Sequence, residues 1–287
     1  MTEPLKKRPL ECCVNLSAMR QTSSAGLRSF CTSICGLLAV SFAAMAGFAQ
    51  QPNTGSTAKM PEDPKQLMLL AAQTNRLSGE GMKPWQLKAS FTVYDANGST
   101  SDQGKLEILW INDQQYKIVL VSPKFSKAYY GTKRGLLTSG QSNPEPTPLV
   151  WAANEFVWPT LPPEGLKDLK FERHDEDLGG TKLTCLTLKD TKLTTVGKFQ
   201  TPTYCLDADL PVLRLGTHEG DLHRFLRNNI ISFQGRYVPA DITAVLAQKT
   251  DLKVHLEDLQ ELKTIEETAF RPPPDARPVT PRAIPAR

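Results

Sequence analysis

The feature that most constrains the fold of this chain is a regular alternation of apolar and polar side chains. Residues 85–95 read WQLKASFTVYD, in which every second side chain from Leu87 to Val93 is apolar. Successive side chains of a strand point to opposite faces, so this period of two predicts a half-buried β-strand. The DANG sequence at residues 95–98 predicts a tight turn that returns the chain into a second strand.

Similar short segments recur along the rest of the chain. A second strand at residues 105–111 and a third at residues 115–122 are separated by the turn residues Asn112 and Asp113. Further strands are predicted at residues 128–132, 136–139, 169–173, 183–189, 203–206, 212–217, 229–233, 237–245 and 253–262. Such closely spaced strands are typical of an antiparallel sheet that curves strongly or closes into a barrel.

Two helices are predicted among these strands. Asp63 can cap the first helix, Pro64 suits its first position, and the helix is expected to end before Ser78. Residues 148–156 are the candidate for a second helix. We therefore predict a mainly β protein with one or two helices, in which residues 62–270 form one domain. Its core would be a single curved antiparallel sheet or an incomplete β-barrel.

Residues 1–49 have the pattern of a signal peptide. Residues 34–49, ICGLLAVSFAAMAGFA, carry no charge, follow basic residues and end in small-residue cleavage patterns. Because this leader is long, residues 1–18 are interpreted as a mis-started extension before Met19. The apolar run is shorter than the roughly 20 residues that cross a bilayer, which predicts cleavage and a location in the periplasm. The alternative is an inner-membrane protein anchored by the uncleaved leader, its only membrane contact. Residues 50–61 are expected to be disordered.

The distribution of charge argues against a nucleic-acid partner. The first 49 residues hold five Lys or Arg against two acidic residues, and residues 271–287 hold four arginines against Asp275. With a formal net charge of +4 for the whole chain, the body between these segments is slightly acidic. It lacks the clustered positive charge that phosphate binding needs. Residues 271–287 also contain six prolines, which predicts a disordered Pro/Arg-rich tail.

The cysteines fit an oxidising compartment. Four of the six cysteines lie in the leader, which leaves Cys185 and Cys205 for the exported chain. A structural disulfide between these two is the simplest arrangement. The alternative is a redox or metal-binding pair, but the chain has no CxxC spacing and neither cysteine has a histidine close by in sequence.

Patterns of catalytic residues are weak in this chain. His218 and His223 superficially resemble a zinc-protease pair, but they are five apart around a glycine instead of four apart on one helical face. The HDED run at residues 174–177 could bind a divalent cation, although such runs are usually solvated turns between strands. The chain also lacks GxSxG, P-loop and GxGxxG sequences. We therefore expect no enzyme activity, no cofactor and no bound metal.

The aromatic side chains predict an apolar ligand site. The residues expected to line it are Phe91, Trp110, Trp151, Phe156 and Trp158. On the concave side of a curved sheet they would enclose a water-poor cavity for a lipid or acyl chain. The proline-bounded stretch PLVWAANEFVWPTLPP would cover that cavity as a lid or plug. The alternative is ordinary core packing, which every one-domain β protein needs.

Several segments carry a resemblance to envelope proteins. PWQLKASFTVYDANG from Pro84, TYCLDADLPVLR from Thr203 and FQGRYVPADI from Phe233 resemble the N-terminal extracytoplasmic domain of acidobacterial TonB-family proteins. More distantly, the first helix, the strand meander and the D…LP.LR pattern resemble the LolA/LolB lipoprotein-carrier superfamily. That second resemblance implies an incomplete β-barrel packed around helices. It transfers no ligand residues, because the carrier family has no fixed motif for its lipid site.

Two functional classes are compatible with these observations. The first is a periplasmic binding or carrier module for a lipid or lipoprotein acyl chain. The second is a structural or interaction module that contacts an envelope protein and binds no small ligand. In the TonB-family proteins, a Pro-rich linker and a TonB-type domain follow the similar region. The chain ends within what would be that linker, so we expect the sensor or carrier-like half alone.

Overall fold

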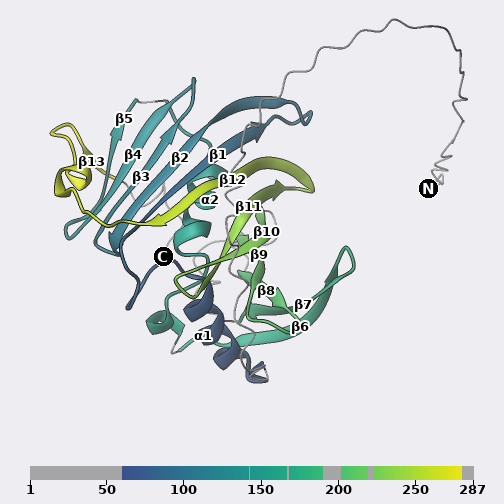
Figure 1. Ribbon diagram of the computed structural model, residues 1–287. Helices are drawn as coiled ribbons and strands as arrows, with labels where there is room; N and C mark the ends of the chain where they lie inside the picture. The colour runs from purple at the N-terminus through teal and green to yellow at the C-terminus, as the bar shows by residue number, and fades with distance from the viewer. Residues whose placement is uncertain (1–59, 142, 167, 190–201, 219–222, 280–287) are drawn as a thin grey trace, which may run out of the picture. The chain divides into compact units, whose positions relative to one another are not determined.

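The computed structural model describes residues 60–279, apart from residues 142, 167, 190–201 and 219–222 (Figure 1). The chain divides into two units, Met1–Ala49 and Gln50–Arg287, and every described residue belongs to the second. The predicted signal peptide, the predicted disordered segment up to residue 59 and residues 280–287 of the predicted tail lie outside the described part. None of the helices described is long and apolar enough to span a membrane.

The described residues form a mainly β structure. Its helices are α1 (Pro64–Asn75) and α2 (Thr147–Val157), with the 3-10 turns η1 (Pro163–Leu166) and η2 (Glu267–Phe270). Its strands are β1 (Trp85–Tyr94), β2 (Thr100–Asn112), β3 (Gln115–Val121), β4 (Ser126–Thr132), β5 (Gly135–Gly140), β6 (Phe171–Leu178), β7 (Thr181–Leu188), β8 (Thr203–Asp207), β9 (Leu213–His218), β10 (His223–Phe233), β11 (Arg236–Leu246), β12 (Lys249–Glu261) and β13 (Arg277–Pro278).

All of these strands belong to one antiparallel sheet that curves around the two helices (Figure 1). The strand order is β13-β5-β4-β3-β2-β1-β12-β11-β10-β9-β8-β7-β6. Most consecutive strands are neighbours, but β12 returns to pair with β1, β13 pairs with β5, and β5 and β6 do not pair. The sheet does not close, because β13 and β6 remain its two edges. The predicted single curved antiparallel sheet is confirmed.

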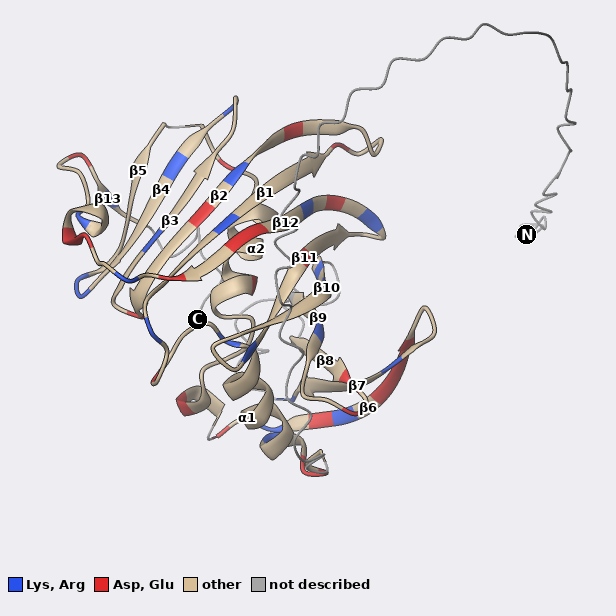
Figure 2. Ribbon diagram, in the orientation of Figure 1, with Lys and Arg blue, Asp and Glu red and all other residues tan. Residues whose placement is uncertain are grey.

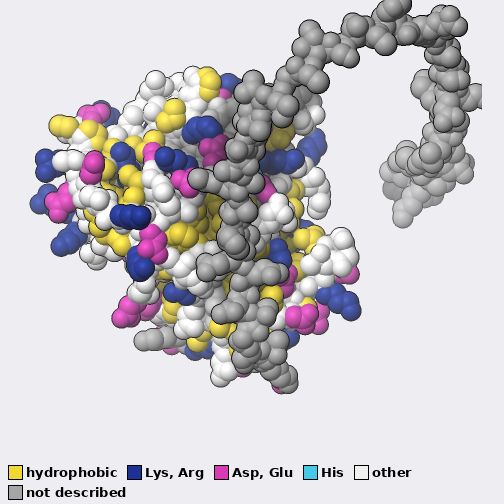
Figure 3. Space-filling model, in the orientation of Figure 1, with side chains coloured by type: hydrophobic (Ala, Val, Ile, Leu, Met, Phe, Trp, Pro, Cys, Tyr) yellow, Lys and Arg dark blue, Asp and Glu magenta, His cyan; other side chains and the backbone are white. Residues whose placement is uncertain are grey.

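Alternation along the strands separates a buried face from an outer one. In β1, Leu87, Ala89 and Phe91 are buried, while Lys88 between them is exposed. The polar side chains that alternate with these buried residues therefore lie on the outer face of the sheet. The space-filling view accordingly shows hydrophobic side chains interspersed with Lys, Arg, Asp and Glu (Figure 3).

Helix α1 begins as its sequence predicts. Asp63 is the N-cap and its Oδ1 accepts a hydrogen bond of 2.8 Å from the backbone N–H of Gln66, while Pro64 occupies the first turn. At the other end, Asn75 is buried and ties the helix to the β8–β9 turn. Its Nδ2 donates to the Pro211 carbonyl at 2.6 Å and its Oδ1 accepts from the Leu213 N–H at 2.9 Å. The helix is thus fixed at both ends.

Removing the cap should have a small but measurable effect. Asp63→Ala is expected to lower the free energy of unfolding by about 1 kcal/mol, because the N–H of Gln66 loses its acceptor. Asp63→Asn keeps an acceptor at the same position and is the matched control. Urea denaturation of both variants measures the difference, and equal midpoints for the two would show that the cap contributes nothing.

The core lies on the concave face of the sheet in two main groups of buried side chains. Helix α2 packs with apolar residues of β1–β4 and β10–β12, including the stacked rings of Trp85 and Trp110 at 5.9 Å between centroids. Helix α1 packs with residues of β7, β8 and the start of β9, such as Leu186 and Leu213. Each helix therefore covers its own part of the same sheet.

The predicted disulfide is present in the structure. Cys185 of β7 and Cys205 of β8 are direct register partners, with their Cα atoms 3.9 Å apart, and both are fully buried. They pack with Leu183, Leu215 and the partly buried Leu226. The bond thus joins two neighbouring strands inside a small apolar group.

The HDED run is a strand, which corrects the expectation of a solvated turn. Residues 174–177 lie in β6, which pairs along its whole length with β7, and the turn comes afterwards at Gly179. In Figure 2 the ribbon of β6 carries both acidic (red) and basic (blue) positions. Because β6 is an edge strand with both faces largely exposed, it needs no apolar alternation. Charge on such an edge also discourages pairing with another chain.

Two other segments differ in extent from their predictions. Strand β10 begins at His223, well before the expected start at residue 229, because Phe225 and Arg227 also face inward from it. In the tail, Arg277 and Pro278 pair with Thr138 and Leu137 of β5, where a disordered segment was expected. The tail up to residue 279 therefore adds a short strand to the sheet edge.

Candidate functional site

Helix α2 is buried on most of its surface. Leu149, Ala152, Phe156 and Val157 are almost fully buried, as is the charged Glu155. A helix that is apolar nearly all round must be enclosed by protein, and the curved sheet encloses this one. The predicted second helix at residues 148–156 is thereby confirmed.

Arg227 caps the C-terminal end of α2. The carbonyl of Glu155 has no helical partner, since the residue four positions later is Pro159, which lacks an N–H. Arg227 Nη1 from β10 donates to this carbonyl and lies 3.1 Å from the Glu155 carboxylate oxygen Oε2. Just beyond the helix, Arg76 Nη1 donates to the Thr160 carbonyl at 2.5 Å. Cations at a helix C-terminus are favoured by the helix dipole.

A cavity of about 330 Å³ lies between α2 and strands β3–β5, and we call it the apolar cavity. Its side chains come from alternate positions of β3, from β4 and β5, and from α2. Those that form most of the apolar wall are Ile118, Leu120, Tyr129, Leu136, Val150, Trp151 and Ala153. The volume is at the lower end of the roughly 300–1,000 Å³ found for ligand sites.

One end of the apolar cavity is polar. Arg76, Glu155, Thr160 and Tyr204 line it and all four are buried. Burial raises the pKa of the Tyr204 hydroxyl, the negative charge of Glu155 raises it further, and the charge of Arg76 acts in the opposite direction. Burial lowers the pKa of Arg227, which the charge of its partner Glu155 opposes. This end therefore concentrates paired charges and neutral hydroxyls in a dry environment.

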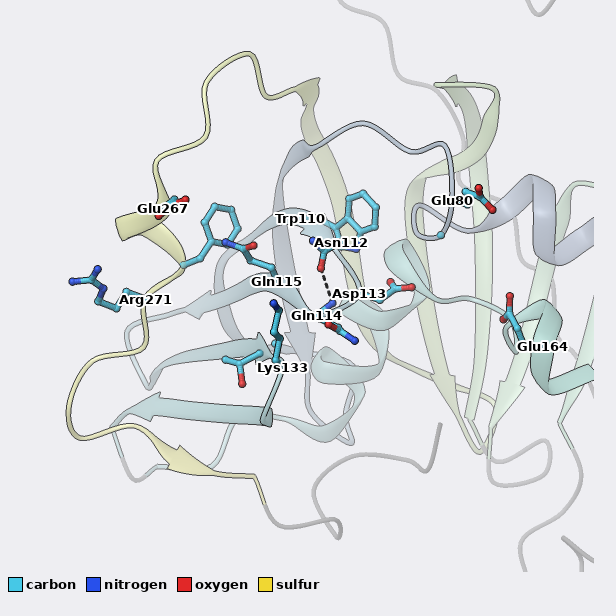
Figure 4. A pocket seen from close by; sticks show the side chains of 14 residues that line it. Glu80, Trp110, Asn112, Asp113, Gln114, Gln115, Lys133, Glu164, Glu267 and Arg271 are labelled. Carbon is cyan, nitrogen blue, oxygen red and sulfur yellow. Dashed lines mark hydrogen bonds between the residues drawn. The ribbon is translucent and has the colours of Figure 1, made fainter.

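A second cavity, of about 880 Å³, is lined mainly by polar side chains (Figure 4). Its charged residues are Glu80, Asp113, Lys133, Glu164, Glu267 and Arg271. Asp113 lines both cavities, and its Oδ1 accepts a hydrogen bond of 3.2 Å from Trp158 Nε1. This polar cavity therefore adjoins the apolar one at Asp113 and Trp158.

The structure separates the five predicted lining residues. Trp151 and Trp158 line the apolar cavity, and Trp110 lines the polar cavity. Phe91 and Phe156 line neither of these cavities and belong to the core, where they are 2% and 0% exposed. Ordinary core packing, the alternative interpretation, thus accounts for these two.

Several lining residues were not anticipated. Tyr116, Ile118 and Leu120 alternate along β3, and this period of two was a usable signal for one wall. Arg76 and Tyr204 come from segments far apart in sequence, and no local pattern connects them with α2.

The two weak metal candidates gain no support. His174 and Glu176 form one exposed pair, with 3.2 Å between Nε2 and Oε1. The neighbouring Cys185 cannot serve as a third ligand because its sulfur is in the disulfide. The residues between His218 and His223 lie outside the described part of the chain.

Comparison with known proteins gives structural matches only. No family of known proteins and no curated protein matches the sequence. A LolA superfamily protein from Nitrosomonas europaea matches with a TM-score of 0.51 at 11% identity, over 74% of this chain and 99% of that one. The fold is LolA-like.

Another solved structure lies just below this level of similarity. A putative outer membrane lipoprotein-sorting protein domain from Vibrio parahaemolyticus gives a TM-score of 0.48 at 13% identity, over 72% of this chain and 97% of that one. The Nitrosomonas europaea structure, with its TM-score of 0.51, confirms the LolA-like part of the predicted resemblance for the fold. The resemblance to TonB-family proteins stays a prediction.

Proposed function

We propose that this is a non-enzymatic exported protein that binds or carries a lipid or lipoprotein acyl chain in the periplasm. The observation that supports the proposal is the apolar cavity between α2 and β3–β5, with Trp151 and Trp158 in its wall. The LolA-like fold fits a binding role of this kind. Binding would need no covalent step, because each buried methylene group contributes roughly 0.8 kcal/mol.

Helix α2 would act as the cover of this cavity. It begins at Pro146–Pro148 and is followed by Pro159, Pro162 and Pro163, so both flanking segments are stiff and break the helical hydrogen-bond pattern. Such a helix can move as a unit, and a small displacement of it would open the cavity along one side.

Filling the apolar cavity should weaken ligand binding. Val150→Trp places a large ring in the wall of the apolar cavity and is expected to weaken binding of a fluorescent acyl probe by about tenfold or more, because two or more methylene groups lose their contacts. Val121→Trp is the matched control, since Val121 is 43% exposed at the end of β3 and lines neither described cavity. Fluorescence titration of both variants measures the difference.

Thermal unfolding should first show that both variants fold. Equal affinity in the two variants would place the ligand elsewhere. Native mass spectra of the exported protein before and after organic extraction provide a second readout, in which a lipid mass lost on extraction supports carriage.

The second candidate is an interaction module related to TonB-family proteins. The observation that favours it is the pairing of Arg277 and Pro278 with β5, which holds the basic tail along an open sheet edge. A partner strand or an envelope protein would bind there through main-chain hydrogen bonds. Absence of any lipid in the mass spectra, together with failure of the acyl probe to bind, would favour this second function.

A further inference from the structure

The two ends of the sheet differ in how they are protected. The edge strand β6 carries charged residues along its length, and such charge discourages pairing with another chain. At the other end, β5 has the sequence GLLTSG without any charge and is paired along its whole length with β4. Its outward side is covered only by the two-residue strand β13 of the tail. An uncharged strand of this kind can accept an added strand.

Strand β13 covers β5 with few contacts (Figure 1). It consists of Arg277 and Pro278, and both residues are exposed. The next residue, Val279, is partly buried, and its N–H donates to the Leu136 carbonyl at 3.0 Å. Because β5 is six residues long, a longer strand could pair with more of it than β13 does.

The proline of β13 prevents a further strand from pairing outside it. Residues two apart in an antiparallel strand direct their N–H groups to the same side, so the N–H of Arg277 faces β5, as that of Val279 does. Pro278 has the opposite orientation and has no N–H to donate. A partner strand would therefore form a ladder with β5 itself, in place of β13.

The charges beside β5 favour an acidic partner. Lys133 and Arg134 in the β4–β5 turn are exposed, and neither forms an ion pair with a residue that the structure describes. The acidic Glu145 accepts a hydrogen bond from the Tyr129 hydroxyl of β4 and lies 4.0 Å from the ammonium group of Lys127, so its charge is matched. The two cations of the turn are thus available to carboxylates on an added strand.

A buried hydroxyl on β5 supports the same chemistry. Thr138 Oγ1 is buried and has no hydrogen-bond partner within the described part of the chain. Arg277 is its register partner, and a guanidinium group carries donors only. A carboxylate on an added strand at the position of Arg277 could accept a hydrogen bond from this hydroxyl.

We propose that β5 binds an extended acidic segment of another protein, which displaces β13 and continues the sheet. Main-chain groups of the segment pair with Leu136 and Thr138, and its carboxylates contact Lys133 and Arg134. This inference rests on the second candidate function, the interaction module, because it gives that module a binding strand and a partner chemistry. It needs no lipid in the apolar cavity.

Two labelled peptides test the charge of the partner. An octapeptide of alternating glutamate and valine and one of alternating lysine and valine are titrated against the exported protein by fluorescence anisotropy. The glutamate peptide is expected to bind about tenfold or more tightly, because the cations of the β4–β5 turn attract it and repel the lysine peptide. Lys133→Glu/Arg134→Glu should reverse this order. Lys88→Glu, at an exposed position of β1, is the matched control and should not.

Two backbone variants locate the strand that binds. Arg277→Pro removes the N–H that β13 directs at β5, so the glutamate peptide should bind about fivefold more tightly. Arg277→Ala keeps this N–H and is the matched control. Thr138→Pro removes an outward N–H of β5 without affecting the ladder to β4, and should weaken binding by about tenfold or more. Thermal unfolding shows whether each variant folds, and the turn variants keep the test valid if Thr138→Pro does not.

The outcomes separate this inference from the proposed carrier function. Equal affinity for the two peptides, or unchanged affinity in Arg277→Pro and Thr138→Pro, would overturn the β5 site. Self-association of Arg277→Pro in sedimentation would also overturn it, because a second copy would then occupy the edge. The acyl probe is titrated into the same samples. If that probe binds and the glutamate peptide does not, the β5 site is wrong while the carrier function stands; if only the peptide binds, the carrier function fails.

Discussion

Replacing Arg227 by methionine is expected to lower the free energy of unfolding by about 3–5 kcal/mol. Arg227 is fully buried in β10, and its Nη1 is shared between the carboxylate and the backbone carbonyl of Glu155. Methionine would leave the Glu155 carboxylate without this cation in a low-dielectric interior. It would also remove the donor that Arg227 supplies to this carbonyl, which Pro159 cannot replace because it has no N–H.

The double variant distinguishes the cost of a lone charge from the contribution of the pair. Glu155→Leu combined with Arg227→Met removes both charges and fills the space with apolar groups, so most of the loss should be recovered. The four members of this cycle can be compared by urea denaturation. A double variant as unstable as the Arg227→Met single variant would show that the loss comes from packing or from the carbonyl.

A partly exposed ion pair in the same sheet supplies the matched control. Arg214 makes two hydrogen bonds to Asp207, of 2.8 and 2.9 Å, but its side chain is 32% exposed. Arg214→Met is therefore expected to cost no more than about 1 kcal/mol. If Arg227→Met is no more destabilising than Arg214→Met, burial does not set the strength of the Arg227 interaction.

The overall fold could be predicted because its determinants are local. Alternation in residues 85–95 identifies β1, the turn at residues 95–98 leads into β2, and Asp63 with Pro64 marks the start of α1. Each of these features is complete within a few residues of sequence. The antiparallel order then follows, since short turns connect strands that pair side by side.

Strand β6 could not be predicted to its full length for a physical reason. Alternation of apolar and polar residues identifies a strand that has one buried face. The edge strand β6 has almost no buried residues, so it shows no such alternation. Its residues form a strand because β7 offers a row of hydrogen-bond partners, which is a property of a segment later in the chain. The sequence of β6 alone therefore does not predict its full length.

The candidate site was harder to predict than the fold. The aromatic residues were predicted as one group of lining residues. On the same helix, however, Trp151 lines the apolar cavity, whereas Phe156 lies in the core and does not line it. The Glu155–Arg227 pair joins positions 72 residues apart. A glutamate inside an otherwise apolar helix, and an arginine two positions after Phe225, were the signals that each needed a buried partner.

Removing the disulfide is expected to lower the free energy of unfolding by about 3 kcal/mol. The bond between Cys185 and Cys205 closes a loop with a sequence separation of 20, and the chain-entropy model gives about this value for such a loop. For a domain of this size the midpoint of thermal unfolding would fall by about 6–12 °C. Thermal unfolding of the exported protein with and without reductant measures the shift directly.

The Cys185→Ala/Cys205→Ala variant separates the bond from general effects of reductant. Its midpoint should lie close to that of the reduced protein and should not change when reductant is added, because the exported chain would then contain no disulfide. Both cysteines are 0% exposed and pack with Leu183 and Leu215, so reduction of the folded protein should also be slow. The protein can also be unfolded and refolded completely in reductant. If its unfolding midpoint is then unchanged, the β7–β8 pairing and its apolar neighbours are sufficient to stabilise this part of the sheet. The strands would then be held by their ladder alone, and the bond would contribute no net stability.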